Sequence, residues 1–363
     1  MQYSLRVDYH EPDLGPLLIG GLKPFVERAR RTDQGLALSY RTHWRHGPHV
    51  LIGLAAAGGT HDAVAAALAD HLRHWLALHP STTQLDPDAY GRMAGQFAAL
   101  ENLDGPLLPI HENNRVTAGD FQRPLFWDDA ALSEIQDGFI SDSLDVLFDL
   151  IEQRLHSRTN GLMALVRLLV AIDRMAAPAR FDYWPISIRA QAKATQINLP
   201  DVHAAHAAKS RLILQRVDAL GGYFEAQPQD SGPPAPIAHW IGLLERLSIA
   251  IRKQIAEASD AYRNSLQPND IAQVSHQYGL TEHQYRSIMF NRDYLSYRAF
   301  MNIIYMFFPL SGFTIQERLL AGRIISDYLD EHRPDTMAKA RAGVMELQGR
   351  ELINPMPRHG LAS

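Results

Sequence analysis

The chain has 363 residues, 46% of them hydrophobic and 21% charged, and it contains no cysteine. This composition is ordinary for a globular protein with a large core, and the lack of cysteine excludes disulfides, thiolate nucleophiles and thiolate metal sites. The formal charge of −5 gives no overall basic bias of the kind that nucleic-acid-binding proteins often show. No signal-peptide pattern opens the sequence, and no apolar run approaches the roughly 18 residues of a membrane span. We therefore expect a cytoplasmic protein that binds neither nucleic acid nor membrane.

The first part of the sequence alternates strand patterns with helical patterns. The elements we expect are a strand over residues 3–9, a helix over 16–31, a hairpin of two strands over 36–54 and a helix over 60–78. Thr60 is a natural N-cap for the last of these helices. This order predicts an α+β fold with helices on one side of a small sheet.

The rest of the sequence is mainly helical. We expect helices over residues 86–102, 130–157, 161–177, 201–224, 239–262, 269–278, 282–291, 297–308, 315–332 and 336–348. Between them lie an irregular segment at 104–121, a predicted strand at 180–189 and a Pro/Gly-rich surface linker at 227–236. The predicted fold class is therefore α+β, with a small, mainly antiparallel sheet near the N-terminus and a large helical remainder. We expect one domain over residues 1–353 and a flexible tail over 354–363.

The hairpin at residues 36–54 is the most informative stretch. Its first half alternates with period two, so that Leu38 and Tyr40 face one way while Ser39 and Arg41 face the other. Gly47-Pro48 interrupts the pattern, and an apolar strand follows. The hairpin contains three histidines, His43, His46 and His49, and metal binding is one interpretation of them. We favour solvent-facing or substrate-facing histidines, because three residues astride a turn need not converge on one ion.

Motif searches exclude several common classes of enzyme. The sequence has no Walker A motif, no Gly-x-Gly-x-x-Gly, no Gly-x-Ser-x-Gly and no His-Glu-x-x-His. A phosphate cradle, a dinucleotide site, a hydrolase nucleophile elbow and a zincin site are therefore not predicted.

Three short stretches of the sequence together indicate a relationship. The first is WRHGPHVLIGL in the hairpin, with Tyr40-Arg41 and Trp44 in the first strand and Pro48-His49 opening the second. The second is PISIRAQAK at 185–193, and the third is MNIIY at 301–305 followed by LSGF at 310–313 and Glu317-Arg318. In this order and spacing they span nearly the whole chain and resemble the lantibiotic dehydratase C-terminal superfamily, which includes glutamate-elimination domains and thiopeptide-type bacteriocin biosynthesis proteins.

The sequence departs from the elimination members of that superfamily where they carry charge. Their second hairpin strand bears arginines that bind the glutamyl carboxylate, and the matching positions here are Leu51 and Gly53. A histidine and an acid of the second motif are replaced by Gln191 and Lys193. The resemblance therefore points to the branch that lacks elimination chemistry, the thiopeptide pyridine synthases.

Membership of that branch implies a formal [4+2] cycloaddition between two dehydroalanines of a modified precursor peptide, with loss of water and of the leader peptide. It implies no cofactor and no metal, and a partner peptide that carries dehydroalanines and thiazoles. We expect the catalytic residues to be His49, Tyr305, Arg189 and Ser187, with His49 or Tyr305 moving protons. We expect Tyr40 and Trp44 to form walls of the peptide site, and Arg41 and Asn302, like Ser187 and Arg189, to hold carbonyls.

Structural interpretations stand beside these functional ones. Arg41 and Arg189 can simply pair with acids, Ser187 can point outward from a strand, and Trp44 and Tyr305 can be core residues. Two other functions also stay open. One is a glutamate-eliminating lyase whose arginines come from elsewhere, such as Arg41, Arg45 or Arg189. The other is a non-catalytic protein that binds a leader peptide, and a homodimer is one alternative for the assembly.

Overall fold

The computed structural model describes residues 3–32, 36–55, 61–101, 104–119, 129–176, 179, 184, 188, 200–216, 235–257 and 291–332. Contacts within the chain divide it into two compact units. The first consists of Met1–Phe126, Ser133–Gly161 and Tyr305–Thr314, and the second of Trp127–Leu132, Leu162–Ile304 and Ile315–Ser363. The expectation of one domain over 1–353 stays a prediction.

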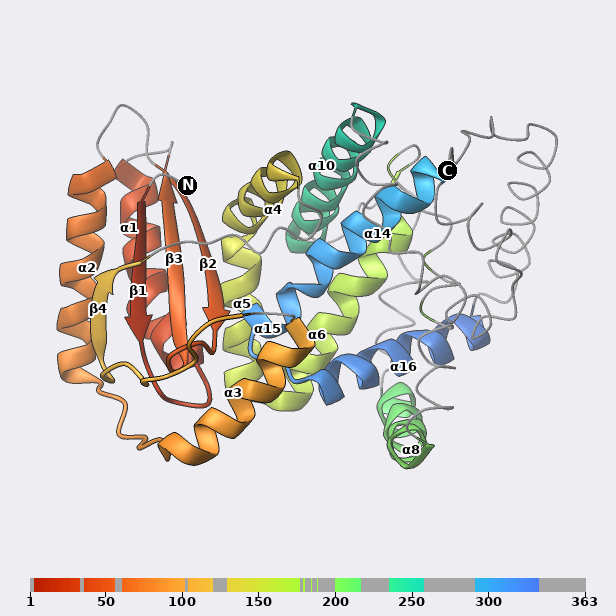
Figure 1. The fold of residues 1–363 in the computed structure, drawn as a ribbon. Helices are drawn as coiled ribbons and strands as arrows, with labels where there is room; N and C mark the ends of the chain where they lie inside the picture. The colour runs from red at the N-terminus through yellow and green to blue at the C-terminus, as the bar shows by residue number, and fades with distance from the viewer. Residues whose placement is uncertain are drawn as a thin grey trace, which may run out of the picture. The chain divides into compact units, whose positions relative to one another are not determined.

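The first unit contains a four-stranded antiparallel sheet in the order β2-β3-β1-β4 (Figure 1). Its strands are β1 (Tyr3–Asp8), β2 (Ala37–His43), β3 (His49–Ala55) and β4 (Arg115–Ala118). The predicted first strand and hairpin are confirmed, and so is the α+β class. Strand β4 was not predicted, because only Val116 in this four-residue strand is buried and the sequence shows no alternation there.

Helices cover one face of this sheet. They are the π-helical turn η1 (Leu17–Leu22), α1 (Lys23–Thr32) and α2 (His61–Leu78), and Figure 1 shows α1 and α2 on the same side of the strands. Helix α2 contacts β1, β3 and β4. The side chains that these elements bury include Leu5, Val7, Ile52, Leu68 and Leu72. The predicted helices over 16–31 and 60–78 are confirmed, and α3 (Pro87–Glu101) confirms the next one.

The helix predicted over 130–157 is interrupted at Ser143. It consists of α4 (Ala130–Asp142) and α5 (Leu144–His156). The hydroxyl of Ser143 donates a hydrogen bond to the carbonyl of Phe139 at 2.5 Å. A serine that bonds back to the preceding turn in this way bends or breaks a helix, which the hydrophobic pattern alone does not reveal.

Arg154 of α5 joins three distant segments of the first unit. Its two terminal nitrogens donate to the carboxylate of Asp13 at 2.9 and 2.6 Å, and its Nε donates to the carbonyl of Ser311 at 2.7 Å. Gly312 has a φ of +76°, and a Cβ there would lie 2.8 Å from the guanidinium. A cavity of about 190 Å³ adjoins this contact, and Arg154, which already has these partners, is the one charged residue in its lining. We therefore assign the contact a structural role.

Where the structure describes it, the second unit is helical. Its elements are the greater part of α6 (Arg158–Val170), η3 (Ala171–Arg174), α8 (Pro200–Arg216), α10 (Ala235–Glu257), α14 (Arg292–Tyr305, except its last residue) and α16 (Ile315–His332). The pair α8 and α16 is joined by Asp327, which accepts from Ser210 at 2.8 Å and pairs with Arg323 at 2.8 Å. The short helix α15 (Phe307–Leu310), which follows α14 in the sequence, belongs to the first unit.

The strand predicted at 180–189 is wrong at the two positions that the structure describes. Trp184 and Ile188 have helical backbone, and both side chains are buried. Aromatic and β-branched residues here reflect burial rather than an extended backbone. Several predicted segments lie outside the described residues. They are most of the linker at 227–236, the helices at 269–278 and 336–348, nearly all of the helix at 282–291, and the tail. Within the described ranges, no helix is both long and apolar enough to cross a membrane.

Tyr40 provides a test of how β2 is held to the α15 segment. Its side chain is completely buried, and its hydroxyl donates to the carbonyl of Leu310 at 2.9 Å. We expect Tyr40→Phe to lower the free energy of unfolding by about 1–3 kcal/mol, because it leaves a buried carbonyl without its donor. Urea unfolding of Tyr40→Phe beside Tyr3→Phe, whose hydroxyl has no hydrogen bond within the described part of the chain, measures this. Equal stability of the two variants would contradict it.

Candidate active site

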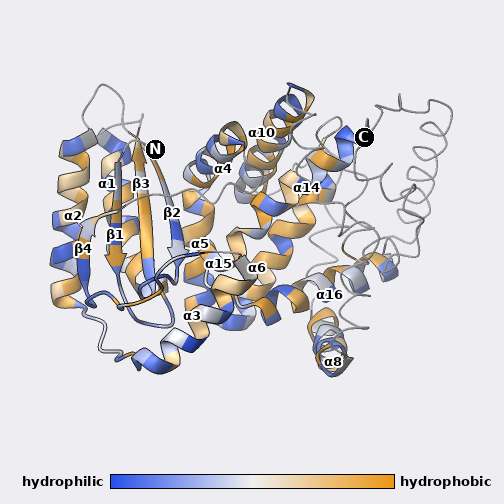
Figure 2. Cartoon of the chain, in the orientation of Figure 1, coloured by the Kyte–Doolittle hydropathy of each residue, from blue (hydrophilic) through white to orange (hydrophobic). Residues whose placement is uncertain are grey.

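The sheet has one apolar face and one polar face. Residues that lie opposite one another in antiparallel strands share a face, so the register assigns each side chain. The face that we call the polar face carries Ser4, Arg6, Asp8, Ser39, Arg41, His43, His49, Leu51, Gly53, Arg115 and Thr117. The opposite face carries Leu5, Val7, Leu38, Tyr40 and Ile52, which are all buried. Figure 2 shows hydrophobic colour along most of β3 and hydrophilic colour where it meets the turn.

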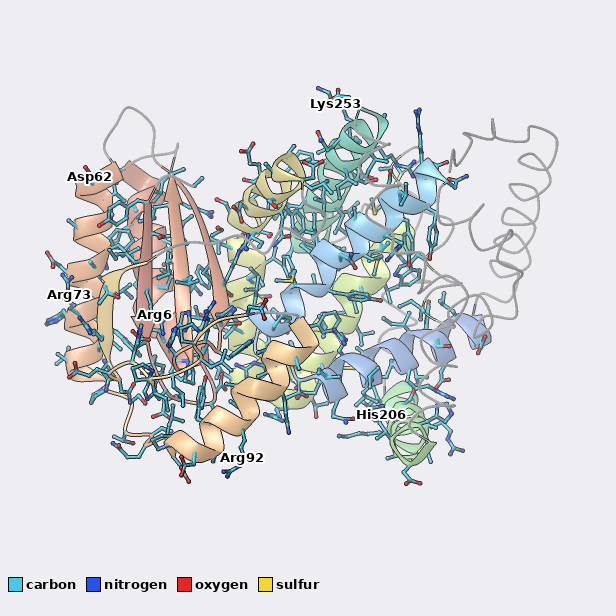
Figure 3. The ribbon with its side chains drawn as sticks, in the orientation of Figure 1. Arg6, Asp62, Arg73, Arg92, His206 and Lys253 are labelled. Carbon is cyan, nitrogen blue, oxygen red and sulfur yellow. The ribbon has the colours of Figure 1, made fainter. Side chains whose placement is uncertain are left out.

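A buried ion pair on β1 occupies the polar face. The guanidinium of Arg6 donates from Nε to Oδ1 of Asp8 at 2.8 Å, and its Nη2 lies 2.7 Å from the same oxygen. Asp8 is 0% exposed, and its Oδ2 has no hydrogen-bond partner among the described residues. A buried carboxylate oxygen without a protein donor is costly, and such groups call for an explanation such as a catalytic role or an ordered water or ion. In Figure 3, Arg6 lies among side chains rich in nitrogen and oxygen at the end of the strands.

His49 lies directly opposite Asp8, at the start of β3. Its ring is 2% exposed, and Nδ1 lies 2.8 Å from the carbonyl oxygen of Gly47. Because a carbonyl only accepts, Nδ1 carries the proton and Nε2 is left with a lone pair. Burial lowers the pKa of His49 to about 3, and the nearby Arg6 cation acts in the same direction. His49 is therefore a neutral imidazole throughout the physiological range, with one ring nitrogen that can accept a hydrogen bond.

The irregular segment predicted at 104–121 packs against the hairpin turn. His46 donates its backbone N–H to the carbonyl of Leu107 at 3.2 Å, and His111 donates to the carbonyl of His46 at 2.8 Å. The rings of these two histidines stack at 5.2 Å, and Nδ1 of His111 lies 3.8 Å from Oδ1 of Asp8. Burial lowers the pKa of His111, so this contact at neutral pH is one between a neutral ring and a carboxylate. The segment thus brings a further ring to the Arg6–Asp8 pair.

Three arginines next to the hairpin, Arg6, Arg41 and Arg45, are engaged by other groups. Arg6 and Arg41 lie on either side of Leu51, the position where elimination domains carry a charge. Arg6 is paired with Asp8, and Arg41 pairs at 3.0 Å with Asp137, both groups being buried. Arg45 donates from Nε to the carbonyl of Pro106 at 3.0 Å. These three arginines therefore already bind internal acceptors, whereas Arg115 of the same face is exposed on β4.

The predicted site residues separate into groups. His49, Arg41 and Trp44 lie on or next to the polar face, whereas Tyr40 lies on the apolar face with no exposed surface. Tyr305 is half-buried in the first unit, with its ring 5.7 Å from that of Phe308, and Asn302 is half-buried in the second unit. Ser187 and Arg189 lie outside the described residues. Among the residues that are described, no group of three or more His, Asp or Glu side chains is arranged to hold a metal ion.

Three residues of this site were missed in the sequence, namely Arg6, Asp8 and His111. A signal for the first two was present, because Ser4, Arg6 and Asp8 share one parity of a strand whose other parity is apolar. Three polar residues in succession on one side of the strand predict that this face of the sheet carries a polar site. No comparable signal existed for His111, which reaches the site through an irregular segment.

Comparison with known proteins places this fold. No protein-family profile matches the sequence, and no curated protein sequence matches it. In structure, the chain shares the fold of a pyridine synthase. That protein is TbtD, the pyridine synthase from thiomuracin biosynthesis, with a TM-score of 0.66 and 20% identity over 91% of this chain and 98% of that one. TsrL is similar over 93% of this chain and 97% of its own, with a TM-score of 0.51 and 14% identity. This similarity of fold confirms the predicted resemblance to a pyridine synthase.

The buried neutral state of His49 predicts a pH dependence of stability. Its pKa of about 3 in the folded protein is below the ordinary value of 6.5, so the unfolded chain takes up a proton that the folded chain does not. Stability is therefore complete above about pH 6.5 and is lost progressively below it. From pH 7 to pH 5 we expect the wild type to lose about 2 kcal/mol more than His49→Gln.

Urea unfolding at the two pH values measures this difference. His74→Gln, at an exposed position of α2, is the matched control and should keep the wild-type pH dependence. An identical loss of stability in the wild type and in His49→Gln would show that His49 titrates normally.

Proposed function

We propose that this protein is a pyridine synthase, which forms a six-membered nitrogen heterocycle from two dehydroalanines of a modified precursor peptide. The observation that carries the proposal is the similarity of fold to the pyridine synthase TbtD over nearly the full length of both chains. The chemistry of the polar face is consistent with it, since the reaction needs proton transfer and hydrogen bonding rather than a bound cofactor.

The proposed reaction balances without an oxidant. The amide before the dehydroalanine farther from the leader moves its N–H proton to the carbonyl oxygen and becomes an iminol, so that C=N–C=CH₂ forms a 2-azadiene. Two new bonds to the alkene of the other dehydroalanine, whose nitrogen carries the leader, close the ring. Loss of water removes the former carbonyl oxygen, and loss of the leader peptide as a carboxamide completes the aromatic pyridine.

The polar face supplies groups for these proton transfers. We assign acceptance of the amide proton to Oδ2 of Asp8, which has no donor among the described residues, while Nε2 of the neutral His49 opposite it is available to accept a hydrogen bond. Proton transfer by positioned groups contributes about 10²–10⁴ in rate. Holding the two alkenes together contributes more, at roughly 7–11 kcal/mol. Tyr305, Ser187, Arg189 and Asn302 stay predicted contributors, and Arg41 supports the site through Asp137.

The engaged arginines argue against glutamate elimination at this face. An eliminating enzyme must bind the side-chain carboxylate of glutamate, and arginine does this with its paired N–H groups. Here Arg6 and Arg41 each bind an internal aspartate, and binding a substrate carboxylate would require breaking a buried ion pair.

A choice between two peptides tests the reaction class. We expect a synthetic peptide with two dehydroalanines and intervening thiazoles to give a pyridine product and a released leader carboxamide, detected by mass spectrometry. We expect a glutamylated peptide of the same sequence to be returned unchanged. Elimination of glutamate from the second peptide would establish the lyase instead. Binding of both peptides without turnover would establish the non-catalytic alternative.

Asp8→Asn tests the proton acceptor. We expect kcat to fall about 100-fold or more, since an amide cannot take up the proton, while the affinity for the peptide changes little. Asp13→Asn is the matched control, because it weakens another Arg–Asp pair of the first unit, with Arg154, away from the polar face. A fall in kcat of the same size in both variants would show that Asp8 acts only through stability.

A further inference from the structure

Four aromatic rings form a continuous row that leads outward from the polar face. The ring of His43 lies 5.6 Å from that of His49 and stacks on Trp44 at 5.2 Å with an interplanar angle of 19°. Trp44 in turn lies 5.8 Å from Phe97 of α3. All three separations are in the range of attractive aromatic pairs. The row therefore joins the buried histidine of the site to a separate helix.

Exposure rises along this row. His49 is 2% exposed, His43 and Trp44 are half-buried, and Phe97 is 38% exposed. Met93 lies one turn before Phe97 on α3 and is 37% exposed, so two large apolar side chains extend the outer end of the row. The hydroxyl of Tyr90 donates to the backbone carbonyl of Trp44, which fixes α3 against the end of the hairpin. A row of packed rings thus links the exposed surface of α3 to the buried histidine of the proposed reaction centre.

We propose that this row, His43, Trp44 and Phe97 with Met93, is the surface on which planar heteroaromatic rings of the peptide substrate stack while its dehydroalanines reach His49 and Asp8. The inference rests on the proposed function for the position of the reacting groups. Two features of the row favour flat rings over aliphatic side chains. His43 and Trp44 are flat rings with nearly parallel planes, Phe97 meets Trp44 at 5.8 Å and a tilt of 43°, and the thioether of Met93 adds a polarizable contact that suits ring edges.

The row determines specificity in this proposal, and it does not take part in bond making. Removing a ring should weaken binding of a peptide that carries rings and leave binding of a ring-free peptide unchanged. A residue that acts only on the fold would weaken both equally. The distinction therefore lies in the affinity ratio of two peptides rather than in turnover.

The test measures Kd by fluorescence polarisation for two labelled peptides. Both carry two dehydroalanines, and one has thiazoles where the other has alanines. We expect Phe97→Leu and Trp44→Leu each to weaken binding of the thiazole peptide about 3- to 10-fold and to leave the alanine peptide within twofold. Phe97→Tyr, which keeps the ring, should retain wild-type affinity. Leu78→Ala, at a residue of α2 that is 64% exposed, should change neither value.

The outcomes separate this inference from the proposed function. Equal effects of Phe97→Leu on both peptides, or no effect on either, would overturn the stacking row even if the enzyme forms the pyridine. A thiazole-selective loss of affinity would support the row even if no pyridine is released, and in that case the proposed reaction alone would fail. Sedimentation of wild type and Phe97→Leu provides a further check. A dimer that dissociates on this substitution would assign the patch to a second copy of the chain and overturn the proposal.

Discussion

A β-strand directs successive side chains to opposite faces, and in the first unit this alternation separates stability from chemistry. One face of the β2-β3-β1-β4 sheet buries Leu5, Val7 and Ile52 on the side of α1 and α2. The other face holds Arg6, Asp8 and His49 at fixed cross-strand positions. The packed apolar side holds the strands in fixed register, so that the buried carboxylate of Asp8 and the neutral imidazole of His49 stay opposite each other.

Much of the fold was predictable because local patterns and tertiary packing agree in those places. The strand at 3–9, the hairpin and the helices at 60–78 and 315–332 were all predicted with nearly correct ends. Failures occurred where packing overrides pattern. At Trp184 and Ile188 bulky apolar residues suggested a strand although the backbone is helical. Strand β4 is too short to show the alternation of apolar and polar residues that predicts a strand. It forms because it pairs with β1, whose residues lie more than a hundred positions away in the sequence.

The site was predictable only in part, for a related reason. The hairpin concentrates histidines and arginines locally, so His49, Arg41 and Trp44 could be identified from the sequence. The face that they share with Arg6 and Asp8 depends on the pairing of β1 with β3, which sequence proximity does not give. The fully buried position of Tyr40 follows from the same parity, since it shares a face with Leu38 and lies opposite Ile52. The aromatic row depends on the packing of α3 against the hairpin, which no single segment encodes.

The contacts of Tyr40 and Arg154 with residues 310 and 311 have a consequence for the way this chain acquires its structure. The first unit gathers residues from three stretches, and its final stretch, Tyr305–Thr314, follows more than 140 residues assigned to the second unit. During synthesis the sheet must therefore wait for that late stretch to leave the ribosome before β2 and Arg154 gain their last partners. The entropic cost of closing a loop grows only slowly with its length. Contacts between residues so far apart in the sequence nevertheless form slowly, because the intervening chain must be brought together first. The four strands can pair early, but docking of Tyr305–Thr314 on β2 and Arg154 is thus a late event.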